Sequence, residues 1–365
     1  MEAILEAIDS MNLPMYKCTK QSMKRYIEGV MTEARNFSVL RASEFLNFPY
    51  QRLQYLVSEA RFKDADVEIE RLRWAVSQST QPGREYNLVI DDTQSKKFVR
   101  TYFASRCYVG NIGKVDIGQS TVFSSLVSDE EIIPFGFKPY LSAENFVKKQ
   151  KDRGFRTKLE LASYLVENAL IFESILGIKI RYVIADSVYA NSGFMNQLNE
   201  GGMKYFFGLK SNRRVKVLTP GQEKPCSLSS LVTAEEGWEN ISLSGREFKV
   251  KSFTCKLRYV GHEVKVFIFC DIHKEGKIHI YGSNDLSMGN QKAIGYYLER
   301  ARMDNKFFRT AKSYLALSRG KFHKLRSYSR HFHIVILTFT ILLLISRRLK
   351  ITMYQLIKNM VRNKN

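Results

Sequence analysis

Two segments of the sequence run from apolar residues directly into aspartates. In "NLVIDDTQS" (87–95) the run ends at Asp91 and Asp92, and in "VIADSVYAN" (183–191) it ends at Asp186. Carboxylates at the ends of two neighbouring strands can hold Mg²⁺, which prefers hard oxygen ligands and keeps several waters. Two such cations roughly 4 Å apart can activate an attacking oxygen and stabilise a leaving oxygen at a phosphate. The two segments therefore predict a metal-dependent phosphodiester site.

A third acid is normally needed, and the C-terminal segment offers only Asp304. Residues 301–365 contain 15 lysines and arginines against this single acid, and so carry +14 of the net charge of +21. A lone acid on a basic, DNA-facing surface would repel the ligand unless a cation bound to it. Each aspartate alone is more typical of a turn or a surface position. The combination favours a site.

The composition indicates a cytosolic protein that binds a polyanion. Lysine and arginine total 57 against 36 acids, an excess that suits nucleic acid. The five cysteines have no CxxC spacing and are expected to be reduced. Glu2 and Glu6 argue against a signal peptide. His331 and His333 are expected at the surface or on phosphate rather than on zinc.

One apolar run, "IVILTFTILLLI" (334–345), could suggest a membrane. Its twelve residues fall short of the ~20 that a membrane-spanning helix needs. We interpret it as a buried helix. The alternative is a short membrane-associated segment with Arg347 and Arg348 at its edge.

Residues 1–80 are predicted to form a helical, DNA-binding domain. Within it, 43–62 is expected to form two short helices that break at Pro49, with Ser43 as a possible N-cap. The same pattern suits any helical bundle. Residues 86–127 read as strands, and 247–271 alternates apolar and polar residues around Gly261 as in a β-hairpin.

A strong helix separates the two acidic strand ends. Thr157 and Glu160 form a T-x-x-E capping box, and Gly177 occupies the C-cap position. The helix leads into "IKIRYVIAD", a continuous apolar strand of the kind that is covered on both faces. A strand, a crossover helix and a second strand predict a mixed α/β layer with Asp186 at one edge.

The sequence resembles the DDE transposases of bacterial insertion sequences. The resemblance covers about residues 40–347 and rests on five motifs: "VIDDT", "CYVGNIGKVDIGQ" (107–119), "VIADSVY", "YGSNDL" (281–286) and "YYLERARMDNKFFRTAKSYLAL" (296–317). It implies an α/β fold, an RNase H-like mixed sheet flanked by helices. The catalytic core would comprise 86–214 and 284–347, interrupted by a β-rich subdomain (215–283) and followed by a basic tail (348–365).

The C-terminal motif fits the family in two registers. The family has Tyr, two residues, Arg, three residues, Glu, six residues, Lys. Tyr297 and Arg300 place Asp304 at the Glu position, whereas the aromatic pair at 307–308 and Lys312 place Asn305 there. A one-residue shift turns a helical side chain by about 100°. We predict that Asp304 faces Asp186, because a neutral amide would leave two metals under-neutralised.

The first acid is also ambiguous. In the family the residue directly before Thr usually matches the metal ligand, which favours Asp92. Adjacent residues of a strand point to opposite faces, so only one of Asp91 and Asp92 can join the site. If Asp91 lay beside Asp186, the assignment would move to Asp91.

The resemblance implies a transposase that cleaves the ends of its element and joins them to target DNA. Asp92, Asp186 and Asp304 would be the catalytic acids and hold Mg²⁺ or Mn²⁺, while Tyr297, Arg300 and Lys312 would bind DNA. The partners would be terminal repeats, target DNA and a second protomer, in the cytoplasm near the nucleoid, with no stable membrane partner. The alternatives are a decayed or domesticated relative that binds DNA without cutting, and a peripheral membrane protein.

Overall fold

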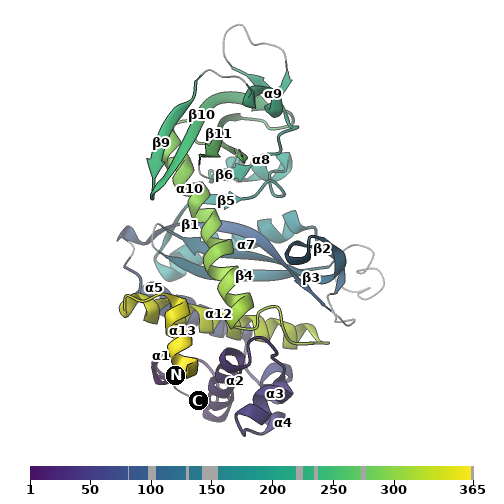
Figure 1. Ribbon diagram of the computed structural model, residues 1–365, viewed down its shortest axis with the longest axis vertical. Coiled ribbons are helices and arrows are strands. Elements are labelled where there is room, and N and C mark those ends of the chain that lie inside the picture. The colour runs from purple at the N-terminus through teal and green to yellow at the C-terminus, as the bar shows by residue number, and fades with distance from the viewer. Residues whose placement is uncertain are drawn as a thin grey trace.

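The molecule is elongated, with helices at one end and a large sheet that runs from the middle to the other end (Figure 1). The computed structural model describes residues 1–80, 82–97, 104–128, 131–141, 155–218, 225–233, 237–272 and 277–362. Both ends of the chain lie at the helical end of the molecule (Figure 1). The fold is mixed α/β with helices flanking the sheet, so the predicted fold class is confirmed.

Within the described residues the strands form a 12-stranded mixed sheet in the order β2-β3-β1-β5-β6-β12-β11-β10-β7-β8, with β4 paired to β3 and β9 to β10. The strands are β1 (Glu85–Lys96), β2 (Ser105–Val109), β3 (Lys114–Val127), β4 (Ile132–Tyr140), β5 (Lys179–Ala185), β6 (Lys204–Gly208), β7 (Arg214–Val217), β8 (Cys226–Ser227), β9 (Glu239–Leu243), β10 (Arg246–Leu257), β11 (Glu263–Asp271) and β12 (Ile278–Ser283).

The helices are α1 (Glu2–Ser10), α2 (Lys17–Thr32), α3 (Val39–Phe45), α4 (Tyr50–Ser58), α5 (Asp64–Ser77), α7 (Lys158–Leu176), α8 (Ser192–Glu200), α9 (Leu228–Val232), α10 (Asn290–Arg302), α11 (Arg309–Tyr314), α12 (Leu325–Arg348) and α13 (Met353–Arg362). Short 3₁₀ turns cover Pro82–Arg84 and Gly110–Ile112. A π-helix, η3 (Met303–Phe308), joins α10 to α11.

The central strands β1 and β5 are parallel and buried on both faces. Alternate residues serve two cores: Val89 and Ile184 pack toward α10 and α12, whereas Leu88 and Val183 pack toward α7. The crossover helix α7 has the predicted capping box and ends at Gly177 in the left-handed conformation, as predicted. This crossover brings the ends of β1 and β5 to the same edge of the sheet.

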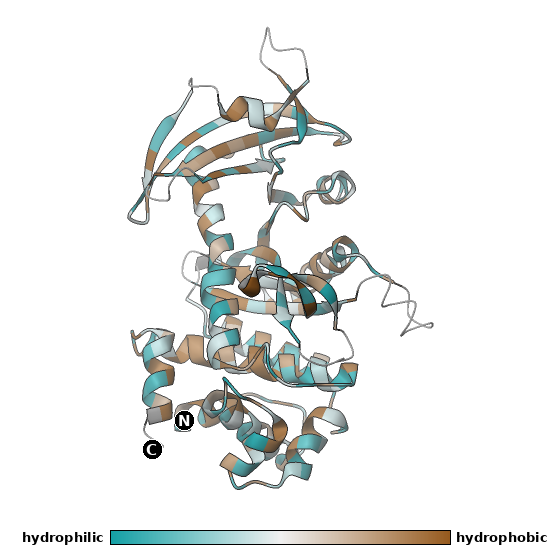
Figure 2. Cartoon of the chain, turned by 45° about the vertical axis from the view of Figure 1, so that its right-hand side comes forward, coloured by the Kyte–Doolittle hydropathy of each residue, from teal (hydrophilic) through white to brown (hydrophobic). Residues whose placement is uncertain are grey.

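The predicted β-hairpin is β10 and β11, but its strands do not form a separate sheet. β12 pairs with β6 and β11 pairs with β12, so these strands extend the central sheet. Hydrophilic and hydrophobic residues alternate along several strands of this extension (Figure 2). Residues 215–283 are therefore continuous with the core through main-chain hydrogen bonds.

Helix α12 confirms the buried-helix interpretation of 334–345. By length and composition the 24-residue helix could cross a membrane, but 78% of its most apolar 18-residue window is buried inside the protein. It contacts α1, α2, α4 and α5 on one side and β4 on the other. One apolar cluster consequently runs from Ile4 and Tyr26 through Ile336 to Phe123. The helical region and the sheet thus share a core.

Two smaller expectations were wrong, the N-cap at Ser43 and the surface position of His331. The N-cap of α3 is Ser38, whose hydroxyl accepts the Arg41 N–H, whereas Ser43 lies inside that helix. His331 is fully buried rather than at the surface. The expected tail contains α13, whose Leu356 and Ile357 are buried in the shared core; residues 363–365 lie outside the described residues.

Candidate active site

The register of β1 and β5 brings two aspartates together. Ile90 pairs with Ala185 in the parallel ladder, so the next residues, Asp91 and Asp186, follow side by side where β5 ends, whereas β1 itself continues to Lys96 beside β3. By strand alternation Asp91 shares a face with Val89, toward α10, and Asp92 faces α7 with Ile90. By this register Asp91, rather than the predicted Asp92, lies beside Asp186 on the face toward α10, because the strand register decides which face each side chain takes.

Asp91 is buried and surrounded by charge. The Arg300 guanidinium lies 3.7 Å from its carboxylate. Burial raises the pKa of Asp91 to about 8; Arg300 opposes the rise, and the charges of Asp304 and Asp186 add to it. Burial also raises the pKa of Asp186, whose carboxylate accepts the Val188 N–H at 2.9 Å. These acids are close enough to repel one another, which favours a cation between them.

Asp92 has different partners. Its carboxylate accepts from Lys158 Nζ at 2.6 Å and from the Ser120 hydroxyl at 3.3 Å, and it also bonds the Gln94 amide. Lys158 is the first residue of α7. The charge of Asp92 still raises the pKa of Asp186, so the salt-bridged pair lies at the border of the site.

The π-helix reconciles the two registers of the C-terminal motif. A π-helix has i→i+5 hydrogen bonds, such as Arg309 N–H to Asp304 O, and so holds one residue more than an α-helical stretch of the same length. The extra residue absorbs the one-residue slip. Arg300 before it and Lys312 after it can therefore both approach the acids.

Asp304 is exposed, and its charge acts on the residues of this cluster. Among the neighbouring acids its charge is the largest contribution to the raised pKa of Asp91. It is also the first acid to oppose the lowering of the Lys312 pKa by burial. Asn305 is exposed as well. These effects associate Asp304 with Asp91 and Lys312.

Of the three predicted DNA-binding residues, two lie beside the acids. Arg300 contacts Asp91, and Lys312 Nζ donates to the Gln94 carbonyl oxygen at 3.1 Å. Tyr297 is turned elsewhere: its hydroxyl bonds His279 Nε2 at 3.0 Å, and its ring packs against Phe269. Tyr297 therefore belongs to the aromatic packing under β12.

The donor types fit Mg²⁺ or Mn²⁺, but the side chains do not yet form a coordination sphere. Within the described parts of the chain, no three Asp, Glu, His or Cys side chains lie close enough together to hold one ion. Arg300 instead supplies the positive charge beside Asp91. Its Nε is buried, with no hydrogen-bond partner among the described residues. An unpaired guanidinium N–H at an acid cluster points to an anionic oxygen as its missing partner.

The sequence analysis did not identify Lys158 as a residue of the site, although its position in the chain could have indicated this. It follows the cap residue Thr157, and the first turn of a crossover helix lies at the edge where the preceding parallel strand ends. A cation at that position would be expected near a strand-end acid. Its partner Asp92 was found, but for a different role.

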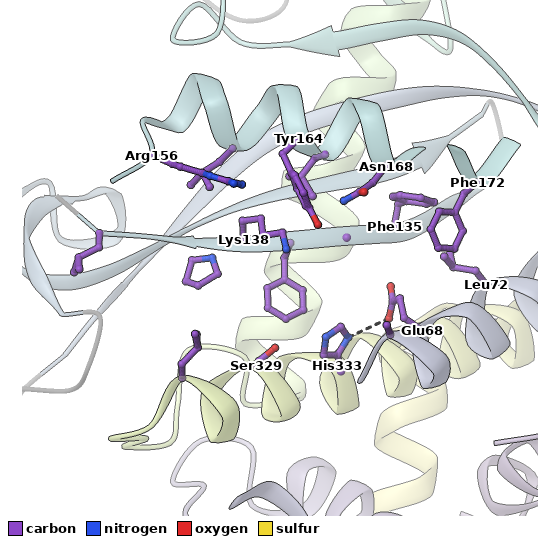
Figure 3. A pocket seen from close by; sticks show the side chains of 18 of the residues that line it. Glu68, Leu72, Phe135, Lys138, Arg156, Tyr164, Asn168, Phe172, Ser329 and His333 are labelled. Atoms are coloured by element: carbon purple, nitrogen blue, oxygen red, sulfur yellow. Dashed lines mark hydrogen bonds and ion pairs between the residues drawn. The ribbon is translucent and has the colours of Figure 1, made fainter. Parts of the chain in front are cut away.

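A cavity of about 800 Å³ lies away from the acids. It runs along β4 between α7 and α12, lined by aromatic residues such as Phe135 and Tyr164 with Lys138 and Arg156 (Figure 3). None of its lining residues belongs to the acid cluster. The chemistry is therefore assigned to the edge of the sheet rather than to this cavity.

Residues 14–226 match the family described as DDE superfamily endonuclease, and the chain belongs to this family. It is 32% identical over 157 residues to a protein of Microchaete diplosiphon named "Probable transposase for insertion sequence element IS701". That alignment spans 42% of this chain and 40% of the relative. The resemblance to insertion-sequence DDE transposases is confirmed, and endonucleases of this superfamily generally use divalent metal ions. The family match includes Asp91 and Asp186 and ends before Asp304.

Proposed function

We propose that this protein is a DNA transposase that cleaves the ends of its element and joins them to target DNA by two-metal phosphodiester chemistry. The observation that carries the proposal is the parallel register that sets Asp91 beside Asp186, next to the unpaired Arg300 Nε. Asp91, Asp186 and Asp304 would hold Mg²⁺ or Mn²⁺. When bound, the metals would supply a nucleophile at neutral pH and stabilise the charge on the leaving oxygen.

The chain's own residues would bind and orient the DNA. Arg300 would donate to a phosphate oxygen near the scissile bond, since a guanidinium suits two oxygens of one phosphate. Lys312, anchored on the Gln94 carbonyl, would neutralise a second phosphate. Lys158 would hold Asp92 in place through their 2.6 Å salt bridge. The proposed partners are terminal repeats, target DNA and a second protomer, in the cytoplasm close to the nucleoid.

The test is cleavage of a labelled duplex that carries one end of the element, with Mg²⁺ or Mn²⁺. Asp304→Ala should abolish cleavage. Asp304→Glu should retain or raise it, because the longer side chain restores the length found in the family. Cleavage that appeared only in Asn305→Glu would mean that the present sequence does not cut DNA.

The second candidate function is DNA binding without cleavage, by a decayed or domesticated relative. It is favoured by the short side chain of Asp304 and by the lack of three converging ligands in the described residues. In that case the wild-type protein would bind the labelled duplex and leave it intact with either metal. Asp304→Ala would then bind equally well.

A further inference from the structure

A basic groove lies where the helical layer meets the end of β1. Its volume is about 770 Å³, and its walls come from the α2–α3 connection, α4, the end of β1 and the loop before α12. Seven lysines and arginines line it, with Glu59 as the one acid among its lining residues. The seven are Arg35, Arg41, Lys96, Lys97, Arg319, Lys321 and Lys324.

Two of these cations are used internally. Lys96 pairs with Asp116 at 3.0 Å. Lys97 is buried, and its Nζ donates to the Ser318 and Gly320 carbonyl oxygens at 2.9 and 3.3 Å. Lys97 thereby fixes the loop before α12 onto the end of β1, which holds the groove in shape.

The other five cations are exposed, and none forms an ion pair with a carboxylate in the described parts of the chain: Arg35, Arg41, Arg319, Lys321 and Lys324. Like charges around one concave surface repel one another and raise the local concentration of anions. Their repulsion is relieved only by a ligand with several negative charges. The spread of the five over the helical layer and the loop suits an extended polyanion better than a single small anion.

The groove continues the acid cluster along β1. From Asp92 to Lys97 the strand advances five residues, roughly 17 Å at about 3.3 Å per residue. That length corresponds to about five base pairs at 3.4 Å each. Lys312, bonded to the Gln94 carbonyl, lies between the two ends.

We infer that this groove binds the phosphate backbone of the duplex whose scissile bond lies at the acid cluster, about five base pairs from that bond. The inference rests on the proposed function and adds the surface that holds the DNA. It also gives the helical layer a role: α3, through Arg41, would contribute phosphate contacts rather than base recognition.

The experiment measures binding of the full chain to a 30-base-pair duplex of arbitrary sequence over a range of salt concentrations. The variant Arg41→Ala/Arg319→Ala/Lys321→Ala should lower the slope of log K against log [salt] by roughly 2.7, at about 0.9 per lost phosphate contact. The control Lys216→Ala/Arg348→Ala/Lys358→Ala removes the same charge from exposed sites outside the groove. Its slope should stay within about 0.5 of the wild type, below one contact. Arg41→Lys/Arg319→Lys/Lys321→Arg should also keep the slope.

A second measurement uses the wild-type protein and does not depend on how the variants fold. A duplex with an azidophenacyl group on one backbone phosphorothioate is photo-crosslinked, and the labelled peptides are identified. Peptides that contain 35–41 or 318–324 are expected.

The groove assignment and the proposed function can be rejected by different outcomes. Equal slopes for the two triple variants, or crosslinks only outside these segments, would overturn the groove assignment while leaving DNA binding intact. A wild-type protein with no affinity for the duplex would reject the proposed function itself. If the groove variant lost binding to phosphatidylglycerol vesicles but kept its DNA slope, the groove would bind a lipid surface, and the inference would be wrong.

Discussion

Asp91 and Arg300 form an ion pair of 3.7 Å that joins the middle of β1 to helix α10. The two residues are far apart in the sequence, and the neighbour of Asp91 along β1, Asp92, has a different environment. Asp92 bonds Lys158 on the opposite face of the strand. The pair therefore marks which of two adjacent aspartates faces the helix that carries Asp304.

The first prediction separates the two aspartates. Asp91→Asn should weaken Mn²⁺ binding by at least about tenfold, since it removes a carboxylate from the site, whereas Asp92→Asn should change it by less than about threefold. Mn²⁺ binding can be titrated by electron paramagnetic resonance, which does not require that the enzyme be active. The reverse order of effects would return the assignment to Asp92.

The second prediction concerns the π-helix. Deletion of Asn305 removes the extra residue, so α10 and α11 should become one regular α-helix with Arg300 and Lys312 still toward the acids. The Tm should stay within a few degrees of the wild type, as measured by circular dichroism. Insertion of one alanine after Asn305 is the matched control. It adds a second extra residue and should rotate Phe307 and Phe308 out of the core by about 100°, with a clear loss of Tm.

The third prediction compares two Glu–Arg pairs on α5. Arg71 is buried and bonds Glu68, Thr340 Oγ1 at 3.0 Å and the Pro134 carbonyl oxygen at 2.6 Å, whereas Arg73 pairs with Glu70 at the surface. Arg71→Met should lower the free energy of unfolding by about 3–5 kcal/mol, because the largely buried Glu68 loses its guanidinium partner and keeps only the His333 Nδ1 contact at 3.1 Å, and the Pro134 carbonyl oxygen loses its donor.

Arg73→Met is the control for this pair. It should change the free energy of unfolding by less than about 1 kcal/mol, as is typical of an exposed ion pair. Urea denaturation of both variants gives the comparison. Similar losses in the two would mean that Arg71 contributes no more than a surface residue.

The fourth prediction concerns pH. His331 is buried; its Nδ1 accepts from the Tyr26 hydroxyl, and its Nε2–H donates to the Ala316 carbonyl oxygen, each at 3.0 Å. Burial and, to a smaller extent, the charge of Lys97 lower the pKa of His331 to about 3, against the opposing effect of its hydrogen bond to the Ala316 carbonyl oxygen. Between pH 6.5 and 3 the unfolded chain would thus bind a proton that the folded protein excludes.

His331 should therefore contribute a loss of stability as the pH drops below about 6.5, of up to about 1.4 kcal/mol per unit. Glu68, whose pKa is lowered to about 2, adds a further loss only below about 4.5. In the interval from pH 6.5 to 5, His262, whose pKa burial also lowers, acts in the same direction, whereas Asp91, whose pKa is raised to about 8, acts in the opposite direction. The histidine is therefore isolated by the difference between the wild type and His331→Gln: the variant should be less stable at pH 6.5, and the difference in urea titrations should shrink toward pH 5. An unchanged profile would assign the acid sensitivity to another group.

The sequence predicted the acids but could not choose between neighbours. The apolar run before Asp186 correctly placed it at the end of β5, but the prediction of a strand end at Asp91 and Asp92 was wrong, because β1 continues to Lys96 through its pairing with β3. The choice between Asp91 and Asp92 depends on pairing with β5, which is a long-range contact and leaves no local pattern. Likewise, the conflict around Asp304 was visible as a one-residue slip, but its resolution by a π-helix depends on how Phe307 and Phe308 pack.

The core that the helical region shares with the sheet could not be predicted for a related reason. Residues 334–345 are apolar on every side of the helix, so other elements must shield all of its faces from water. That cover comes from the first helices of the chain on one side and from β4 on the other. Such a shared core is visible only once the partners of α12 are known.

The position of α12 late in the chain also determines when the shared core can form during translation. The helices that it covers leave the ribosome first, whereas α12 follows roughly 300 residues later, about 15 to 60 s at bacterial rates of synthesis. Until then the apolar faces around Ile4, Tyr26 and Leu53 lack their partner. An mRNA truncated before the codons for α12 would yield a chain that cannot complete its hydrophobic core. Such a chain would be a substrate for proteases and chaperones rather than a DNA-binding fragment.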